Sequence, residues 1–440
     1  MVRIQAQRKT VRSPLAYLKC CKRKMIFILL VVLLVLLGAG NMLKALRNKA
    51  RPQEESLAVF YLGKKYEGSK NEQEESCVEN IEKNKFNSRI GVAVLAAKRP
   101  EYFQKVLSSL QHQSVALGDD FDVFLFVDRI DKDKKGYDEN QQVLKLAKEF
   151  DDASRSRSTL DVRTRTGKHQ GGGIYSPANT NFGIARMTMW AIETIFAPHL
   201  QASNMPVLFN IESDKKVHSI QTHQKYVYER ILILEDDQLI AHNYVEAMGM
   251  LLTAAEDMKH VAVVNGNFIN TPQHGYKRKN MLLLRNDDCQ FQIAPLNAIT
   301  QINSHNVWAW ATTWKKWESI HATYLDAFQK SHLDTLEYGK RDTKTIGKVM
   351  DDLCPGSGYS KNWKGQDWLR ACAFYAQGMR YKLQPTQRLM SYIGQSGLHE
   401  SKESYRRKGF HPVDAHELRV SLKGYPRDLC TRTCYLERMN

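Results

Sequence analysis

The chain has 440 residues and a formal net charge of +17, with 42% hydrophobic, 10% aromatic and 25% charged residues. This composition is typical of a folded globular protein and excludes a disordered or collagen-like chain. Twelve Lys and Arg residues but no acidic residue lie within 1–51, so the rest of the chain carries only +5. A nucleic-acid-binding protein would carry its positive charge on the folded part, and we therefore expect no nucleic-acid partner.

A long apolar segment near the N-terminus predicts a membrane anchor. Residues 25–43 (MIFILLVVLLVLLGAGNML) contain no charged residue and would span about 30 Å as a helix, the thickness of a bilayer core. Eight Lys and Arg residues precede this segment and four follow it closely, which favours a cytoplasmic tail at 1–24 and a lumenal remainder. We expect a single-pass type II protein. A cleaved signal peptide is the alternative, because Gly38-Ala39-Gly40 offers small residues.

The eight cysteines agree with this topology. Cys20 and Cys21 adjoin the anchor on its cytoplasmic side, where palmitoylation is an open option. The other six lie beyond the anchor and predict disulfides of open connectivity in an oxidising lumen. They are Cys77, Cys289, Cys354, Cys372, Cys430 and Cys434. A zinc site is disfavoured, because these cysteines include no CxxC pair.

The remaining chain alternates apolar runs with helical patterns after a polar stem at 44–86. Continuous apolar runs predict strands at 90–96, 121–127, 230–234 and 260–264. Amphipathic spacing predicts helices from Pro100, over 141–150, over 184–196, and from Tyr244 to Ala255. Residues 151–180 are expected to form a long loop and residues 198–228 an insertion. The alternation indicates an α/β fold with a doubly wound, mostly parallel sheet.

The most specific local motif is a buried strand that ends in three consecutive acids (RILILEDDQL). Glu235, Asp236 and Asp237 follow the strand at the edge where open α/β sheets bind ligands. Carboxylates are hard oxygen ligands that suit Mn²⁺ or Mg²⁺, held by one or two of them together with substrate phosphates. The alternative is that Asp236 or Asp237 caps the next helix, although a cap requires only one such residue.

Together these features resemble Golgi glycosyltransferases of the GT-A type, and more narrowly the β-1,2-N-acetylglucosaminyltransferase I family, which includes protein O-mannose relatives. The stretches that carry the resemblance follow the family's order: IGVAVLAAKRPEYFQKVLSSL, FGIARMTMWAIETIF, YERILILEDDQLIAHNYVEAM, NVWAWATTWKKWESI, GQDWLRACAFY and YIGQSGLHES. The EDD stretch is fairly specific, and each of the others is weak alone. The resemblance implies a nucleotide-sugar-binding GT-A core at 87–335 and a region at 336–440 that supplies the catalytic base and the acceptor side.

The resemblance also implies the residues of the active site. Arg99 and Asp128 would hold the uridine, at the ends of the first two strands. Glu235 and Asp236 would contact the sugar and the ribose. Asp237 would coordinate Mn²⁺ that bridges the diphosphate. Asp367, in GQDWLR, would be the catalytic base that removes the proton of the acceptor hydroxyl.

Each of these assignments has a structural alternative. Arg99 and Asp128 can be surface loop residues, and Asp367 can cap the helix that follows it. His399 can close over the phosphates or lie on the surface. Trp308 and Trp310 can line a sugar platform or belong to the core.

One departure from the family affects recognition of the base. Met187 stands where the family usually has a His that helps hold the uracil, and a thioether cannot donate that hydrogen bond. We expect a metal-dependent inverting transferase in the Golgi membrane, with its catalytic domain lumenal. It would transfer GlcNAc from UDP-GlcNAc to a mannose-containing glycan or glycoprotein in β-1,2 linkage. The alternatives are another nucleotide sugar, or an inactive lumenal carbohydrate-binding scaffold.

Overall fold

The structure, a computed structural model, describes most of the chain beyond residue 88. The described residues are 89–115, 117, 120–156, 172–177, 182–209, 227–266, 291–296, 309–335, 342–361, 365–385, 389–394 and 403. All of them lie in one of the two units into which the chain divides, Gly68–Arg438. The predicted tail, anchor and stem, residues 1–86, lie outside the described residues, as do Trp308 and His399. Within the described part of the chain, no helix is both long and apolar enough to cross a membrane.

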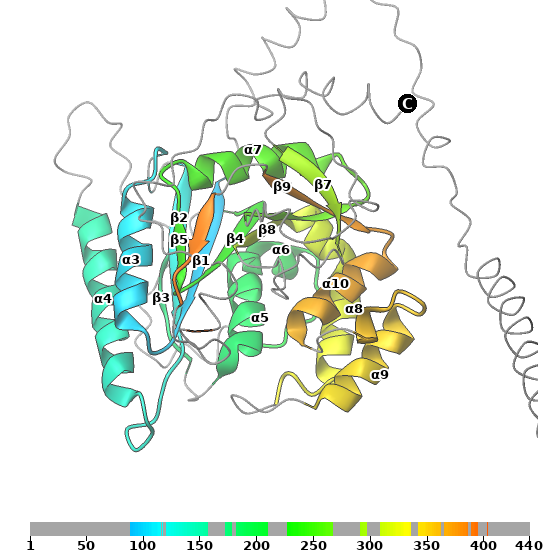
Figure 1. Ribbon diagram of the computed structural model, residues 1–440, viewed down its shortest axis with the longest axis horizontal. Coiled ribbons are helices and arrows are strands. Elements are labelled where there is room, and N and C mark those ends of the chain that lie inside the picture. Colours follow the sequence, from blue (N-terminus) through cyan, green and yellow to red (C-terminus); the bar gives the residue numbers. More distant parts are fainter. Residues whose placement is uncertain are drawn as a thin grey trace, which may run out of the picture. The chain divides into compact units, whose positions relative to one another are not determined.

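A large mixed sheet forms the centre of the described fold (Figure 1). Its eight strands lie in the order β3-β2-β1-β4-β8-β6-β9-β7. They are β1 (Ile90–Ala96), β2 (Phe121–Val127), β3 (Gly173–Tyr175), β4 (Arg230–Glu235), β6 (Val261–Asn265), β7 (Phe291–Pro295), β8 (Trp310–Thr313) and β9 (Tyr381–Pro385). β8 is antiparallel to β4 and β6, and β7 is antiparallel to β9, whereas the other neighbours are parallel. The predicted α/β fold with a mostly parallel sheet is therefore confirmed.

The strands β1, β2 and β4 follow the continuous apolar runs of the sequence. Every residue of β1 and β2 is buried, and a strand covered on both faces requires such an uninterrupted run. Val92 of β1 lies opposite Val123 of β2 on one side and Leu232 of β4 on the other. Because the three strands are parallel, their carboxyl ends lie at the same edge of the sheet, and the loops that follow them meet there.

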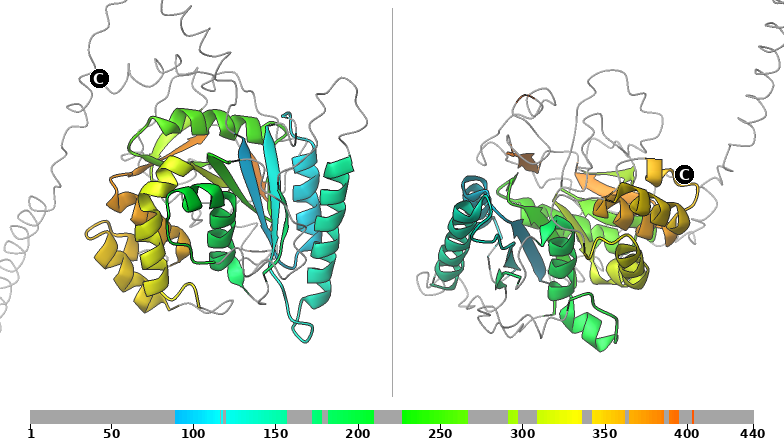
Figure 2. Two further views of the ribbon diagram at one scale, coloured as in Figure 1. Left: turned by 180° about the vertical axis from the view of Figure 1, so that it is seen from behind. Right: turned by 90° about the horizontal axis from the view of Figure 1, so that it is seen from below.

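Helices cover both faces of this sheet (Figures 1 and 2). They are α3 (Pro100–Gln111), α4 (Tyr137–Ser156), α5 (Gly183–Ile195), α6 (Ala197–Ala202), α7 (Tyr244–Glu256), α8 (Trp314–Lys330), α9 (Thr343–Leu353) and α10 (Gln366–Ala376). Side chains alternate between the faces along a strand. Ala93 and Leu95 of β1 accordingly pack in one hydrophobic cluster with α5 and α8, while α3 and α4 lie on the other face (Figure 2).

Several elements differ from those expected from the sequence. The helix predicted at 141–150 covers Tyr137–Ser156, because its polar first turn carries Asp138 and Glu139, which favour a helix N-terminus. The loop predicted at 151–180 contains β3, and the insertion predicted at 198–228 includes most of α6. The strand predicted at 260–264 is found one residue later, at Val261–Asn265. These differences fall on short or polar segments, whose sequence pattern is weak.

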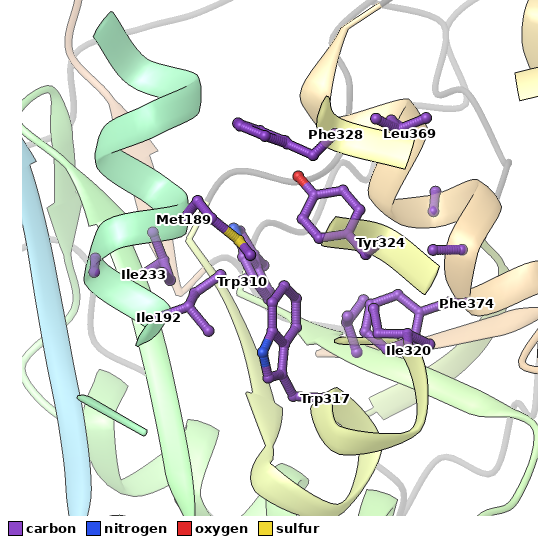
Figure 3. Packing of buried hydrophobic residues seen from close by; sticks show 14 of the residues in the cluster. Met189, Ile192, Ile233, Trp310, Trp317, Ile320, Tyr324, Phe328, Leu369 and Phe374 are labelled. Atoms are coloured by element: carbon purple, nitrogen blue, oxygen red, sulfur yellow. The ribbon is translucent and has the colours of Figure 1, made fainter. Parts of the chain in front are cut away.

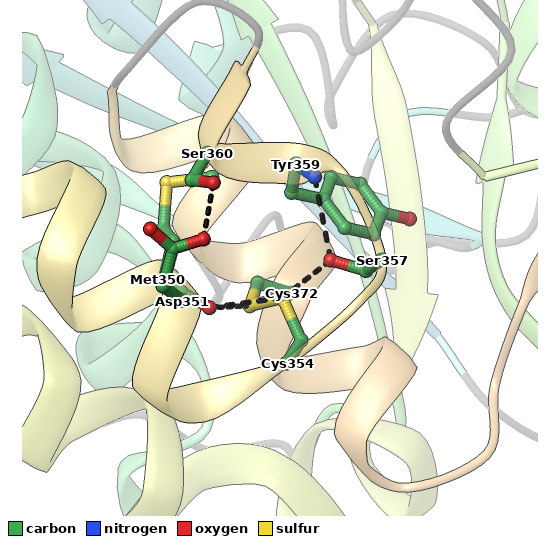
Figure 4. The surroundings of a disulfide bond; sticks show 7 residues. All are labelled: Met350, Asp351, Cys354, Ser357, Tyr359, Ser360 and Cys372. Carbon is green, nitrogen blue, oxygen red and sulfur yellow. Dashed lines mark hydrogen bonds between the residues drawn. A yellow bond between two sulfur atoms is a disulfide. The ribbon is translucent and has the colours of Figure 1, made fainter. Parts of the chain in front are cut away.

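The C-terminal part of the described chain returns to the sheet. β9 pairs with β6 and β7 in the large sheet, and β10 (Met390–Tyr392) pairs with β5 (Gln238–Ile240) in a separate two-stranded sheet. A disulfide joins Cys354, which follows α9, to Cys372 in α10 (Figure 4). It confirms the prediction that the chain contains disulfides. The other four cysteines beyond the predicted anchor lie outside the described residues.

A hydrophobic cluster fixes α10 to the sheet. Side chains from α5, β8, α8 and α10 meet in it, as Met189, Trp310, Trp317 and Leu369 show in Figure 3. Trp317 and Leu369 are fully buried, and Trp310 is only 3% exposed. Such close packing leaves little freedom for the helix that carries Asp367.

Candidate active site

The acidic triplet forms the turn that joins β4 to β5. Glu235 is the last residue of β4, and Asp236 and Asp237 are both 2% exposed. The backbone amide of Asp236 donates to the carbonyl oxygen of Leu95 at 3.0 Å, which ties the turn to the end of β1. Helix α7 begins after Asn243, so neither aspartate caps the next helix. The capping alternative is therefore wrong.

Arg99, which links β1 to α3, contacts the triplet directly. Its Nη1 donates to Oδ2 of Asp237 and its Nη2 donates to Oδ1 of Asp236. Burial lowers the pKa of Arg99, but the carboxylates of Asp236 and Asp237 outweigh that effect and raise it overall. Arg99 is thus a permanent cation within the site rather than a loop residue in solvent. Its predicted contact with the uridine stays a prediction.

Asp236 and Asp237 of the triplet are buried, and Glu235 beside them is partly exposed. Burial, together with repulsion from Asp237 and Asp367, raises the pKa of Glu235 to about 8. Burial also raises the pKa of Asp236, to about 6, although Arg99 opposes the shift. Burial raises the pKa of Asp237 as well. One guanidinium does not fully compensate three neighbouring carboxylates, two of them buried, and the site therefore favours a further cation.

Asp367 lies near this cluster, although it is far away in the sequence. It belongs to the first turn of α10, which begins after Gly365, so Asp367 is not the capping residue of that helix. Its Oδ1 accepts a hydrogen bond from Nη2 of Arg370 at 3.0 Å, and its side chain is 37% exposed. Repulsion from Asp367 contributes to the raised pKa of Glu235, so the two carboxylates lie close enough to interact electrostatically.

Arg370, which donates the hydrogen bond to Asp367, was not identified from the sequence. Its side chain is 2% exposed, and its guanidinium carbon lies 3.8 Å from the centre of the Trp310 ring. A cation over an indole face is attracted by the ring's negative face. Trp310 is therefore a core residue that supports the site, and the core alternative for this tryptophan holds.

Asp128 lies at the end of β2, apart from the contacts of the triplet. Its Oδ1 accepts from the amide of Phe182 at 2.8 Å and its Oδ2 accepts from the amide of Gly183 at 2.9 Å. These amides begin α5, where a carboxylate is favoured. The pKa of Asp128 is raised by burial, and the two hydrogen bonds oppose the shift. Any contact between Asp128 and a uridine would involve a carboxylate already bonded to this helix.

Met187 lies one turn into α5. Its side chain is 2% exposed and belongs to the hydrophobic cluster. The residue that replaces the family's His is thus a core residue, and it offers no hydrogen bond to a base.

Two further residues of the site come from β10 and the residues that follow it. The hydroxyl of Tyr392 donates a hydrogen bond to the side chain of Asp237. The amide of Ile393 donates to the backbone oxygen of Asp237 at 2.8 Å, and Gly394 lies against the carboxylate. Sequence reasoning missed Tyr392 and Gly394. The only available signal was their place at the start of YIGQSGLHES.

The arrangement leaves one buried carboxylate oxygen for a divalent cation. Oδ1 of Asp237 is buried and has no hydrogen-bond partner within the described part of the chain. Among the described residues, no group of three or more His, Cys, Asp and Glu side chains is placed to hold a metal. A cation bound by Asp237 would therefore complete its coordination with water and substrate oxygens, the usual manner for ions bound with phosphates.

No protein-family model matches the sequence, and a search of curated proteins finds no match either. Among solved structures, residues 1–349 of TarS from S. aureus match at 12% identity and a TM-score of 0.33, over 78% of this chain and 73% of that chain. The galactosyltransferase LgtC with donor and acceptor sugar analogues matches at 12% identity and a TM-score of 0.26, over 74% of this chain and 85% of that one.

Mouse xyloside xylosyltransferase 1 matches at 10% identity and a TM-score of 0.25, over 67% of this chain and 97% of that one. These matches are a distant structural similarity to glycosyltransferases of the GT-A type, and they identify no particular family. Because their TM-scores lie below 0.5, these matches carry no argument about function, and the proposal below rests on the site and on the sequence motifs that resemble the glycosyltransferase family.

Proposed function

We propose that this protein is a metal-dependent, inverting glycosyltransferase that transfers GlcNAc from UDP-GlcNAc to a mannose-containing glycan or glycoprotein in β-1,2 linkage. The observation that carries the proposal is a buried acidic turn at the carboxyl edge of the sheet, with one free oxygen on Asp237 and a second carboxylate, Asp367, nearby. The anchor predicted at 25–43 would hold it in the Golgi membrane with the catalytic domain in the lumen.

The chain's own groups would divide the work as follows. Asp367 removes the proton from the acceptor hydroxyl while the acceptor oxygen forms its bond to the anomeric carbon. The bond between that carbon and the diphosphate breaks in the same displacement, so UDP leaves and the α-linked donor becomes a β-linked product. Asp237 would hold Mn²⁺, or Mg²⁺, which when bound supplies positive charge to the leaving diphosphate. Arg370 keeps Oδ1 of Asp367 in place.

A second candidate is a transferase of the same type that uses another nucleotide sugar. It is favoured by Met187, because a buried thioether cannot take over the hydrogen bond that the family's His provides. The inactive scaffold is a weaker candidate, since it gives no reason for Asp236 and Asp237 to be buried beside a third carboxylate at a high cost in desolvation.

The test is a donor screen with the purified full-length protein. UDP release is measured with Mn²⁺, a mannose-containing acceptor, and UDP-GlcNAc, UDP-galactose or UDP-glucose in turn. We expect release from UDP-GlcNAc, loss of release with EDTA, and its return with Mn²⁺. Release from a different donor would support the second candidate, and donor binding without any release would support the scaffold.

Two carboxylate substitutions test whether Asp237 is needed for the metal-dependent activity. Asp237→Ala should remove most of the activity, because it removes a buried carboxylate oxygen that has no hydrogen-bond partner in the described part of the chain. Asp326→Ala removes an exposed carboxylate on α8, paired with Lys330 at 2.7 Å, and should keep wild-type activity. Transfer that is unaffected by chelation would refute the metal-dependent proposal.

A further inference from the structure

The two carboxylate oxygens of Asp237 have different surroundings. Oδ2 accepts from Nη1 of Arg99, whereas Oδ1 is buried without a hydrogen-bond partner in the described part of the chain. The hydrogen bond from the Tyr392 hydroxyl therefore also goes to Oδ2. One oxygen is committed to two donors, and the other is left for a ligand.

Gly394 shows how closely Oδ2 and the Tyr392 hydroxyl are packed. A Cβ atom added at Gly394 would lie 2.6 Å from Oδ2 of Asp237 and 2.6 Å from the hydroxyl oxygen of Tyr392. The backbone of Gly394 is not in the left-handed region, so its conformation is open to other residues. The requirement for glycine at this position is a matter of space around the carboxylate.

The backbone places Tyr392 at this point. Tyr392 of β10 lies opposite Gln238 of β5, the residue that follows Asp237. The amide of Ile393 donates to the Asp237 carbonyl oxygen, and the amide of Ala241 donates to the Leu389 carbonyl oxygen, both at 2.8 Å. β10 is thus bonded to β5 at both ends, and the tyrosine is held against Asp237 by main-chain contacts.

We propose that Tyr392 is a positioning residue, with Gly394 as its necessary neighbour, that holds Oδ2 of Asp237 so that Oδ1 alone faces the metal ion. This inference rests on the proposed function, because it assumes that Asp237 binds a divalent cation together with the diphosphate. Groups that orient a metal ligand through a hydrogen bond typically contribute about 10- to 100-fold to metal affinity. The loss of one hydroxyl group should therefore be measurable.

The chain contains a matched control at the other end of the same strands, where β1, β2 and β4 begin. The buried Asp122 accepts at Oδ2 from the Tyr228 hydroxyl at 2.7 Å and from Nε of Arg89 at 2.9 Å. This is the same Arg–Asp–Tyr arrangement, located where β1, β2 and β4 begin. Tyr228→Phe removes the same kind of hydrogen bond at a place remote from Asp237.

The experiment measures Mn²⁺ binding to full-length protein by electron paramagnetic resonance, with and without UDP, for Tyr392→Phe, Gly394→Ala and Tyr228→Phe. Wild-type protein should bind Mn²⁺ far more tightly with UDP than without it. Tyr392→Phe and Gly394→Ala should weaken Mn²⁺ binding in the presence of UDP by about tenfold or more. Tyr228→Phe should bind Mn²⁺ as wild type does, even where its melting temperature falls as much as that of Tyr392→Phe.

Two results would overturn the inference, and they are distinguishable. Wild-type affinity for Mn²⁺ with UDP in both Tyr392→Phe and Gly394→Ala would refute the role of Tyr392 and leave the proposed function standing. Failure of the wild-type protein to bind Mn²⁺ with UDP at all would refute both. Weakening of the same size in Tyr228→Phe would assign the effect to general stability and would also refute the inference.

Discussion

Single residues determine the charge balance of the candidate site. Arg99 neutralises part of the acidic turn, and Arg370 fixes Asp367 from a buried position on Trp310. The two arginines differ in how many carboxylates they bind and in how exposed those carboxylates are. Arg99 bonds to two carboxylates, whereas Arg370 bonds to Oδ1 of Asp367 on a side chain that is partly exposed. Under the proposed function, the partly exposed carboxylate of Asp367 would therefore keep access to an acceptor hydroxyl.

Asp367→Asn separates a catalytic base from a structural residue. Asparagine keeps Oδ1 and hence the hydrogen bond from Arg370, but it cannot take a proton from the acceptor. Loss of a general base typically lowers the rate by about 10²- to 10⁴-fold. Turnover should fall by this factor while UDP-sugar affinity and melting temperature stay close to wild type. Near-normal turnover in this variant would contradict the assignment of Asp367 as the base.

A buried lysine predicts how stability depends on pH. Lys382 lies in β9 between β6 and β7 and is 3% exposed. Burial lowers its pKa from 10.5 to about 7. Between these two values the unfolded chain binds more protons than the folded one, so the contribution of Lys382 to the free energy of unfolding rises with pH.

Lys382→Met should remove this dependence. The variant should gain stability near pH 7, by up to a few kcal/mol at about 1.4 kcal/mol per unit of pKa, and the gain should shrink towards pH 10. Urea unfolding of both proteins at pH 7 and pH 9 measures the difference. An equal change in unfolding free energy at the two pH values would show that burial does not control this lysine.

At the scale of elements, α10 is the part that brings the second carboxylate to the sheet. It packs against α8 and α9, and the Cys354–Cys372 disulfide fastens its middle to the end of α9 (Figure 4). The hydroxyl of Ser357 also donates to Sγ of Cys354 at 3.1 Å. The position of Asp367 relative to Glu235 therefore depends on contacts within this group of helices.

Removing the disulfide should destabilise the fold. The two cysteines are 18 residues apart, and a loop of this length corresponds to about 3 kcal/mol of stabilisation. The double substitution Cys354→Ala with Cys372→Ala should lower the free energy of unfolding by that amount in urea. A reducing agent should destabilise the wild-type protein more than the double variant, which has already lost this disulfide. Equal sensitivity of both proteins to the reductant would show that another cysteine pair carries the effect.

At the scale of the whole molecule, the predicted topology places the site on the lumenal side of a membrane. The expectation depends on the apolar segment 25–43 and on the excess of cations before it. In intact microsomes, a C-terminal tag should be protected from protease and an N-terminal tag should be cleaved. Detergent should expose both tags, which serves as the control. Cleavage of the C-terminal tag in intact vesicles would contradict the type II arrangement.

The sequence by itself determined the parts of the fold that depend on local pattern. The strands at 90–96 and 121–127 and the helix from Pro100 lie where their apolar periodicity indicates, because a doubly covered strand and an amphipathic helix each require that pattern. The acidic turn could be predicted as well, because its signal is also contained in neighbouring residues. Three adjacent charges after a buried strand form a local feature.

Only the tertiary structure decided which distant groups meet at that turn. Asp367 lies 130 residues beyond Asp237, and a family resemblance, not its own sequence context, suggested its part in the site. Arg370, Tyr392 and Gly394 carry no local pattern that marks them. Their positions result from the pairing of β10 with β5 and from the packing of α10 on α8. Such contacts join segments far apart in the chain, and no periodicity within either segment encodes its partner.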